Sequence, residues 1–486
     1  MQAPTDNILL RTDSYKVTHW RQYPPGTQFV YSYFESRGGK FHDVVFFGLQ
    51  YYLKRYLEGQ VVTQEKIDEA AALFAAHFGD KEGRLFNRAG WQYILREHGG
   101  RLPVTIRAVP EGTVVPCHNV LMTIENTDPR CFWLTNYLET LLVQVWYGSS
   151  VATQSREMKF LLLKYLDQTG DPGLVDFKLH DFGFRGVSSV ETAGMGAAAH
   201  LVNFLGTDTI EGLVVARDYY SEPMAGFSIP AAEHSTITSW GREHEVDAMR
   251  NMLEQFPAGL VAVVSDSFNI FEACGEIWGE KLRDQVLQRD GTLVIRPDSG
   301  DPPTVLAAGQ PSVFAILCEK FGYSVNDKGY KVLNPRVRVI QGDAVEFEML
   351  DRILYAMKSA GYSADNIAFG SGGGLLQKLN RDTLRFAFKC AGVTVDGVEH
   401  PVYKSPVTDQ EKESKGGRMK LVRVEGPHGS SYATAPAADP REDQLVEVFR
   451  DGRIVREWNF AEIRERARIP EKSRHRSPRP APEGAR

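Results

Sequence analysis

The stretch TLVIRPDSG, residues 292–300, carries the pattern that decides the fold: an apolar run that ends abruptly in polar residues and glycine. Three other stretches repeat the pattern at intervals of about 30 to 45 residues, and each is followed by a sequence compatible with a helix. They are LVAVVSD (260–266), VRVIQGD (337–343) and NIAFGSGGG (366–374). Nearly continuous apolar strands that alternate with helices are typical of a parallel sheet covered on both faces, so the sequence predicts an α/β fold.

Two architectures fit this alternation, a closed barrel and an open, doubly wound sheet. We favour an irregular α/β barrel with parallel strands because at least four strands end in polar side chains, and the doubly wound sheet remains the alternative. In both architectures, ligands bind at the carboxyl ends of the strands. The polar strand ends are therefore expected to form one site.

The segments that flank the barrel are expected to make a mixed α+β domain. QFVYSYFES (28–36) and PVTIRAVPEGTVV (103–115) alternate like half-buried strands, and the second contains a Pro-Glu-Gly turn. Thr63 is placed to N-cap an amphipathic helix that runs through Phe78. We expect residues 1–150, completed by 390–465, to form this domain, residues 151–389 to form the barrel, and the polar, proline-rich residues 466–486 to be a disordered tail.

The composition argues against several classes of function. The formal net charge of -6 and the pI near 6.1 leave no basic excess for a nucleic-acid backbone, so we expect no nucleic-acid partner. The five cysteines are widely spaced and form no C-x-x-C pair, which fits a reducing compartment. No run approaches the roughly 20 apolar residues of a membrane span, and the start does not resemble a signal peptide. We therefore expect a cytoplasmic protein without membrane contact.

The glycine-rich run FGSGGGLLQKLNRD (369–382) is a candidate phosphate site. It follows an apolar strand and enters a sequence compatible with a helix, so the backbone N–H groups around Gly373 can approach an anion. Its spacing matches neither a Walker loop nor a dinucleotide fingerprint. A flexible turn packed against the sheet is the alternative interpretation.

Two strand ends supply candidate groups for a sugar phosphate. In IRPDSG (295–300), Arg296 and Asp298 are two residues apart, so in extended backbone both can point into one cleft. The arginine can hold a phosphate, and the aspartate can hold ribose hydroxyls, hydrated magnesium or the developing charge of a reacting sugar. Asp343 in QGD can bind a sugar diol in the same way. A structural ion pair or ordinary turn chemistry would explain either motif equally simply.

Two further runs combine aromatic, basic and titratable side chains. HDFGFRGVSSVETAG (180–194) places Phe182 to stack on a flat ring and Arg185 to hold a phosphate, although a core phenylalanine and a surface arginine are the simpler interpretation. SIPAAEHSTIT (228–238) contains His234 beside a glutamate. A single histidine is more often structural, but among phosphate-site candidates His234 becomes a possible nucleophile or acid/base.

Taken together, these runs closely resemble the nicotinamide phosphoribosyltransferases from about residue 7 to residue 460. The resemblance rests on long motifs in the same order: TDSYKVTHW, YSYFESR, VATQSRE, KLHDFGFRGVSSVETAG, NFLGTDT, SIPAAEHSTIT, VVSDS, IRPDSG, VIQGD and AFGSGGGLLQK. It implies an enzyme of NAD salvage that condenses nicotinamide with 5-phosphoribosyl 1-pyrophosphate (PRPP), forming nicotinamide mononucleotide and pyrophosphate.

The resemblance also implies how the base is bound. The pyridine ring would lie between Phe182 of one subunit and Tyr15 of the other, so the protein would be a homodimer with shared active sites. Asp208 would accept a hydrogen bond from the carboxamide. Nicotinate would bring a second negative charge, and two unit charges about 4 Å apart repel by roughly 4 kcal/mol at an effective dielectric constant near 20.

The remaining roles are likewise implied by the resemblance. His234 would be phosphorylated by ATP, which stimulates synthesis, and it is assigned to the catalytic group together with Arg296 and Asp298. Magnesium would accompany the pyrophosphate, with no ligands assigned. Nicotinate phosphoribosyltransferase activity and a non-catalytic sensor of nicotinamide or NAD precursors are the alternatives. The phosphates are assigned to Arg185, Arg296, Arg381 and Lys389 and, across the dimer, to Arg37; the ribose is assigned to Asp298 and Asp343, with Gly342 and Gly373 approaching through backbone.

Overall fold

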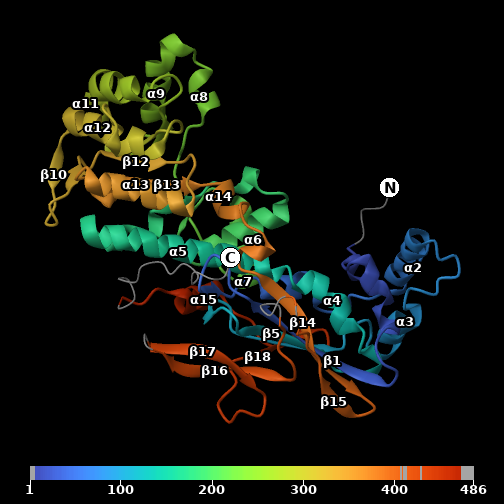
Figure 1. The fold of residues 1–486 in the computed structure, drawn as a ribbon. Helices are drawn as coiled ribbons and strands as arrows, with labels where there is room; N and C mark the ends of the chain where they lie inside the picture. The colour runs from blue at the N-terminus through green and yellow to red at the C-terminus, as the bar shows by residue number, and fades with distance from the viewer. Residues whose placement is uncertain (1–5, 406–407, 409–412, 427–428, 472–486) are drawn as a thin grey trace.

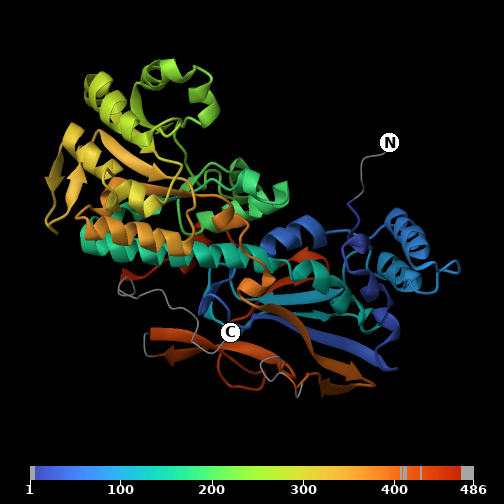
Figure 2. The ribbon, with the colours of Figure 1, turned by 45° about the horizontal axis from the view of Figure 1, so that its top comes forward.

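The structure is a computed structural model of the chain and describes residues 6–405, 408, 413–426 and 429–471. Two large sheets organise it: a parallel sheet surrounded by helices, and an antiparallel sheet that lies below it in Figure 1. The long helix α5, Val145–Thr169, runs between them and contacts helices of the barrel and strand β2. Figure 2 shows the same two-part arrangement from a second direction.

The parallel sheet contains six strands in the order β7-β6-β13-β12-β9-β8. Its two edge strands are joined through the segment 227–231, which forms parallel bridges from Phe227 to Gly206 in β7 and from Ala231 to Ala262 in β8. This segment closes the sheet, so the predicted irregular α/β barrel is confirmed over the doubly wound alternative. The strands are β6 Leu179–Asp181, β7 Gly206–Thr207, β8 Ala258–Val264, β9 Asp290–Arg296, β12 Val337–Gln341 and β13 Ile367–Ser371.

The interior of the barrel is filled by a small apolar cluster that is separate from the main core. Ala262, Val294 and Ile340 from three neighbouring strands are its buried members. The partly buried residues packed against them are Phe182, Ile229 and Ala368. Because a barrel of this size has room only for side chains, these residues form the floor beneath the carboxyl ends of the strands.

Helices follow or precede the strands and form the outer layer of the barrel (Figure 1). Helices labelled η have 3-10 or π geometry. In chain order the elements of this part are η5 Pro172–Phe177, η6 Phe184–Gly186, α6 Val190–Leu201, α7 Ile210–Tyr220, α8 His234–Thr238, η7 Arg242–His244, α9 Glu245–Gln255, α10 Ile270–Glu272, η8 Ala273–Lys281, α11 Arg283–Gln288, η9 Thr304–Ala308, α12 Val313–Phe321, the hairpin β10 Tyr323–Val325 and β11 Lys331–Leu333, α13 Phe347–Ser359, η10 Ala364–Asn366, α14 Gly373–Leu376 and η11 Arg381–Thr383.

The second sheet interleaves N-terminal and C-terminal strands in the order β15-β14-β1-β5-β3-β18-β19. Its strands are β1 Thr27–Ser36, β3 Val104–Ala108, β5 Val120–Asn126, β14 Phe386–Val395, β15 Val398–Pro401, β18 Val446–Arg450 and β19 Arg453–Ile454. Two small sheets, β2 Asp43–Val45 with β4 Val114–Pro116 and β16 Met419–Gly426 with β17 Gly429–Pro436, complete the strands. The associated helices are η1 Ile8–Leu10, η2 Ser14–Arg21, α1 Leu49–Tyr52, η3 Leu53–Leu57, α2 Gln64–Phe78, α3 Arg88–Glu97, η4 Pro129–Cys131, α4 Leu134–Leu142 and α15 Phe460–Ala467.

Local sequence signals explain several of these elements. The Thr63 hydroxyl accepts a hydrogen bond from Lys66 N at 3.4 Å, which confirms the predicted N-cap of α2.

At the other end of the chain, Ala467 and Ile469 are buried, so the first residues of the expected tail pack against the core. The remainder of that tail, 472–486, lies outside the described residues. None of the described helices combines the length and apolar composition that crossing a bilayer requires.

Candidate active site

Three of the predicted site segments meet around Gly342, directly after β12. A methyl group at Gly342 would lie 3.0 Å from Asp298 Oδ1, 3.5 Å from Arg296 Cδ and 3.7 Å from Phe182 Cε2. The guanidinium Nη2 of Arg296 is 3.7 Å from Asp298 Oδ2. Glycine at 342 therefore allows an arginine, a carboxylate and an aromatic ring to lie together at the carboxyl ends of the strands.

Phe182 lies across the end of β13. Its backbone N–H donates to Ser371 O at 2.9 Å, and its ring covers Gly370, where a Cβ atom would be 1.9 Å from Phe182 Cε2. Only glycine fits beneath the ring at that distance. The ring remains partly exposed, so a flat ligand can stack on it.

Asp208 follows β7 and is exposed at the same end of the barrel. The Ser228 hydroxyl donates to its Oδ1, and its backbone N–H donates to Asp181 O at 2.9 Å. Neither Ser228 nor Asp181 was predicted as a site residue, although both lie within quoted motifs. These two hydrogen bonds hold Asp208, the residue predicted to bind the carboxamide, from two sides.

His234 begins α8 and is paired with Asp266, which was not predicted as a site residue. His234 Nε2 lies 3.0 Å from Asp266 Oδ1; the histidine side chain is 45% exposed and the aspartate 5%. The signal for Asp266 was its position at the end of the apolar run LVAVVSD. The pair presents an accessible imidazole whose orientation is fixed by a largely buried carboxylate.

The electrostatics connect these groups at the mouth of the barrel. Burial raises the pKa of Asp298 above its ordinary value. The neighbouring charges act in both directions, since Arg296 and His234 lower this pKa whereas Asp266 and Asp343 raise it. The predicted residues Arg296, Asp298, His234 and Asp343 therefore belong to one interacting cluster, with Asp343 exposed at its edge.

The glycine-rich run lies next to the segment that carries Arg185. Gly373 begins α14, and a Cβ atom there would meet no neighbour within 4 Å. A Cβ atom on Gly186 would lie 3.3 Å from Gly373 N. The segment that carries the exposed Arg185 therefore passes close to the glycine-rich run. The space above Gly373 and the nearby arginine suit an anion.

The other predicted residues form a second group, around Glu139 in α4. Burial lowers the pKa of Lys389; Glu139 opposes this effect, and Arg37 and Arg381 add to it. Partial burial and Glu139 raise the pKa of Tyr15. Tyr15 is 59% exposed. Of these four residues, Tyr15 lies in η2, Arg37 directly after β1, Arg381 in η11 and Lys389 in β14.

This grouping differs from the expected division of the phosphate ligands. Arg381 and Lys389 were assigned to the same subunit as Arg296, but the charges of both Arg381 and Arg37 lower the pKa of Lys389, and Arg37 was assigned across the dimer. In both Figure 1 and Figure 2, strands β1 and β14 extend away from barrel strands β12 and β13. Lys389 lies beside the N-terminal strand rather than at the barrel mouth because β14 pairs with β1, which places Lys389 opposite Tyr33.

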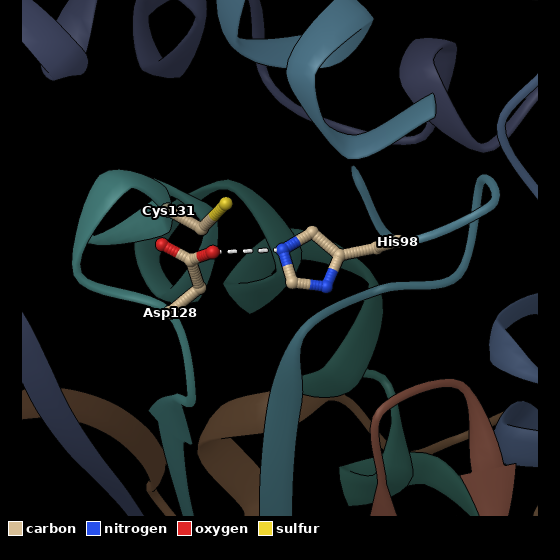
Figure 3. A group of neighbouring side chains, drawn as sticks. All are labelled: His98, Asp128 and Cys131. Carbon is tan, nitrogen blue, oxygen red and sulfur yellow. Dashed lines mark hydrogen bonds and ion pairs between the residues drawn. The ribbon is translucent and has the colours of Figure 1, made fainter. Parts of the chain in front are cut away.

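A separate group, drawn in Figure 3, contains three potential metal ligands. In the part of the chain that the structure describes, the ligand atoms of His98, Asp128 and Cys131 lie within 4.8 Å of one another. Both carboxylate oxygens of Asp128 are engaged: Oδ1 accepts from Arg130 N at 2.8 Å, and Oδ2 is 2.8 Å from both Tyr93 Oη and His98 Nε2. Burial raises the pKa of Cys131 to about 12, whereas metals bind the thiolate. We interpret the group as a hydrogen-bonded network that stabilises the turn before η4.

Comparison with known proteins decides the family. The model of the Nicotinate phosphoribosyltransferase (NAPRTase) family matches residues 177–453, and that of the Nicotinamide phosphoribosyltransferase N-terminal domain matches residues 7–106. The chain belongs to the nicotinate phosphoribosyltransferase family. It is therefore an enzyme, a phosphoribosyltransferase of NAD salvage, and the residues at the barrel mouth lie within the matched region.

Individual members of the phosphoribosyltransferase family are similar over nearly the whole chain. The Nicotinamide phosphoribosyltransferase of Xanthomonas campestris pv. campestris is 54% identical over 470 residues, covering 95% of this chain and 98% of the relative. That of Acinetobacter baylyi is 33% identical, covering 95% and 97%. Among solved structures, nicotinate-nucleotide pyrophosphorylase from Pyrococcus furiosus (TM-score 0.58, 17% identity, 96% of both chains) and human Nicotinic Acid Phosphoribosyltransferase (TM-score 0.57, 16% identity, 97% of this chain and 96% of that one) share the fold.

Proposed function

We propose that the protein transfers the phosphoribosyl group of PRPP to nicotinamide, releasing pyrophosphate and forming nicotinamide mononucleotide. The observation that carries this proposal is the meeting of Phe182, Arg296 and Asp298 around Gly342. An aromatic face next to an arginine and a carboxylate suits a flat base that reacts with an anionic sugar. The names of the most similar relatives support the choice of base.

The proposed chemistry needs positioning and charge stabilisation rather than a general base. The pyridine nitrogen attacks C1 of the ribose while the bond from C1 to the pyrophosphate oxygen breaks. The positive charge that develops on the sugar is stabilised by Asp298, and the pyrophosphate that leaves is held by Arg296 and Arg185. Asp208 accepts a hydrogen bond from the carboxamide N–H, and the Ser228 hydroxyl orients this carboxylate.

Magnesium and ATP complete the proposal. The carboxylates of Asp298 and Asp343 are hard oxygen donors at the barrel mouth and fit Mg²⁺, which is usually bound by one or two carboxylates together with substrate phosphates. Bound magnesium would neutralise charge on the pyrophosphate. ATP would phosphorylate His234, whose exposed ring is held by Asp266.

We further propose a homodimer in which each site is completed by the second subunit. The exposed phenol of Tyr15 supplies a second aromatic face, and Arg37, Arg381 and Lys389 supply a basic group beside it. Assigning Arg381 and Lys389 to the second subunit revises the division that the resemblance implied, because Lys389 lies close enough to Arg37 and Arg381 for both charges to lower its pKa. A cytoplasmic location is supported by the cysteines, all five of which are free thiols.

The proposal is tested by product identification. Purified protein is incubated with PRPP, Mg²⁺ and nicotinamide, with and without ATP, and nicotinamide mononucleotide and pyrophosphate are quantified. We expect stoichiometric formation of both products, stimulation by ATP, and loss of activity when EDTA removes the metal. Absence of the mononucleotide in the complete mixture would refute the proposed reaction.

A further inference from the structure

A buried carboxylate lies behind the proposed base pocket. Asp181, the last residue of β6, is 0% exposed. Its Oδ1 accepts from Gly183 N at 2.7 Å, and its Oδ2 accepts from the Thr207 hydroxyl at 3.0 Å. Burial raises its pKa to about 6, so the ionised form is maintained at neutral pH at an energetic cost.

The contacts of Asp181 connect the two segments that carry the base-binding residues. Gly183 is the residue after Phe182, and the Asp181 carbonyl accepts from Asp208 N at 2.9 Å. Thr207 immediately precedes Asp208, and its hydroxyl oxygen also accepts from Thr209 N at 3.0 Å. One aspartate therefore fixes the backbone on both sides of the proposed pocket.

We propose that Asp181 is a positioning residue for the base: by holding Gly183 and Thr207 it sets the separation of the Phe182 ring from the Asp208 carboxylate. Asp181 itself does not touch the base. The two groups that do touch it, Phe182 and Asp208, directly follow separate strands, β6 and β7, whose parallel pairing covers only two residue pairs. Because β6 and β7 pair over so few residues, the alignment of their carboxyl ends depends largely on the side chain of Asp181.

This role predicts that substitutions act according to the hydrogen bonds they remove. Asp181→Ala removes both acceptors. Asp181→Asn retains an oxygen for Gly183 N, and its amide can donate to the Thr207 hydroxyl oxygen, so it preserves both contacts without the charge. Thr207→Val removes one donor and keeps the side-chain shape, and it serves as the second variant if Asp181→Ala does not fold.

The test measures KM for each substrate at saturating concentration of the other. The inference rests on the proposed function, so wild-type protein is first assayed with nicotinamide and with nicotinate. The variants are then assayed with the base that the wild type uses. We expect Asp181→Ala to raise KM for the base about 10- to 100-fold and Thr207→Val about 3- to 10-fold, with PRPP KM changed less than about threefold. Asp181→Asn should restore base KM to within about threefold of wild type.

The matched control is Asp176→Asn, because Asp176 is an exposed carboxylate near the other end of β6 that pairs with Lys159 at 2.6 Å. It should leave both KM values unchanged. A purely structural role would lower the unfolding temperature and kcat without separating the two KM values. That result, or an Asp181→Asn variant as impaired as Asp181→Ala, would overturn the inference. A wild type that turns over neither base would instead count against the proposed function.

Discussion

His234 Nε2 lies 3.0 Å from Asp266 Oδ1, and the carboxylate is almost fully buried whereas the imidazole is not. This pairing fixes the ring and leaves Nδ1 as the nitrogen to be phosphorylated. We therefore expect His234→Ala to lose the ATP-stimulated part of mononucleotide synthesis and to keep the ATP-independent part. The measurement is the initial rate with and without ATP, whose ratio should fall to about one.

A second histidine provides the control for this prediction. His244 Nδ1 lies 3.0 Å from Asp247 Oδ2, but both side chains of this pair are exposed. His244→Ala should keep the wild-type ratio of the two rates. ATP stimulation that persists in His234→Ala would contradict the phosphohistidine role.

Asp208→Asn should weaken the preference for nicotinamide over nicotinate. The substitution removes a negative charge that opposes a second carboxylate, and the full repulsion of roughly 4 kcal/mol sets an upper limit. Because solvent at this exposed site reduces the effect, we expect the ratio of kcat/KM values to shift at least about tenfold. Glu211→Gln, on the first turn of α7, is the matched control and should leave the ratio unchanged. An unaltered ratio in Asp208→Asn would contradict the assigned role.

Asp298→Asn should reduce activity without reducing stability. Burial raises the pKa of Asp298 in the folded state, so between its unfolded and folded pKa values the folded protein binds more protons than the unfolded chain. The free energy of unfolding therefore falls as pH rises through that window, and the ionised carboxylate is unfavourable at neutral pH. The asparagine variant should unfold at the wild-type temperature or higher, while kcat/KM falls at least about 100-fold. A clear loss of thermal stability with little loss of activity would show that Asp298 is structural.

Shared active sites can be tested by mixing two inactive variants. Tyr15→Ala and Asp208→Ala affect different parts of the proposed composite site, so a mixed dimer retains one intact site. Random exchange makes half of the dimers mixed, and activity should recover to about a quarter of the wild-type value. Subunit exchange is verified with two differently tagged chains. Exchange without any recovery would contradict the sharing of sites.

The barrel and its polar mouth could be predicted because each depends on a local pattern. Apolar runs such as Val261–Val264 are buried on both faces, and parallel strands bring the residues that follow them to one end. Arg296, Asp298 and Asp343 could therefore be assigned to one site from strand ends alone. The N-cap of α2 at Thr63 was equally local.

The remaining features depend on contacts between distant segments. The segment 227–231 closes the barrel through two isolated bridges and has no strand-like alternation, so its role could not be predicted. The placement of Lys389 depends on the register of β14 against β1, which lies more than 300 residues earlier in the chain. Asp181 and Asp266 lie at strand ends, but their hydrogen bonds with Thr207 and His234 become visible only in three dimensions.

The central claim is that Phe182 and Asp208 hold a neutral pyridine amide beside the sugar-phosphate groups at Gly342. The most direct test is the ratio of kcat/KM for nicotinamide to that for nicotinate, measured on wild-type protein at saturating PRPP. We predict that nicotinamide is favoured at least about 100-fold, as expected when an anionic base meets a carboxylate. Equal or faster use of nicotinate would contradict this assignment.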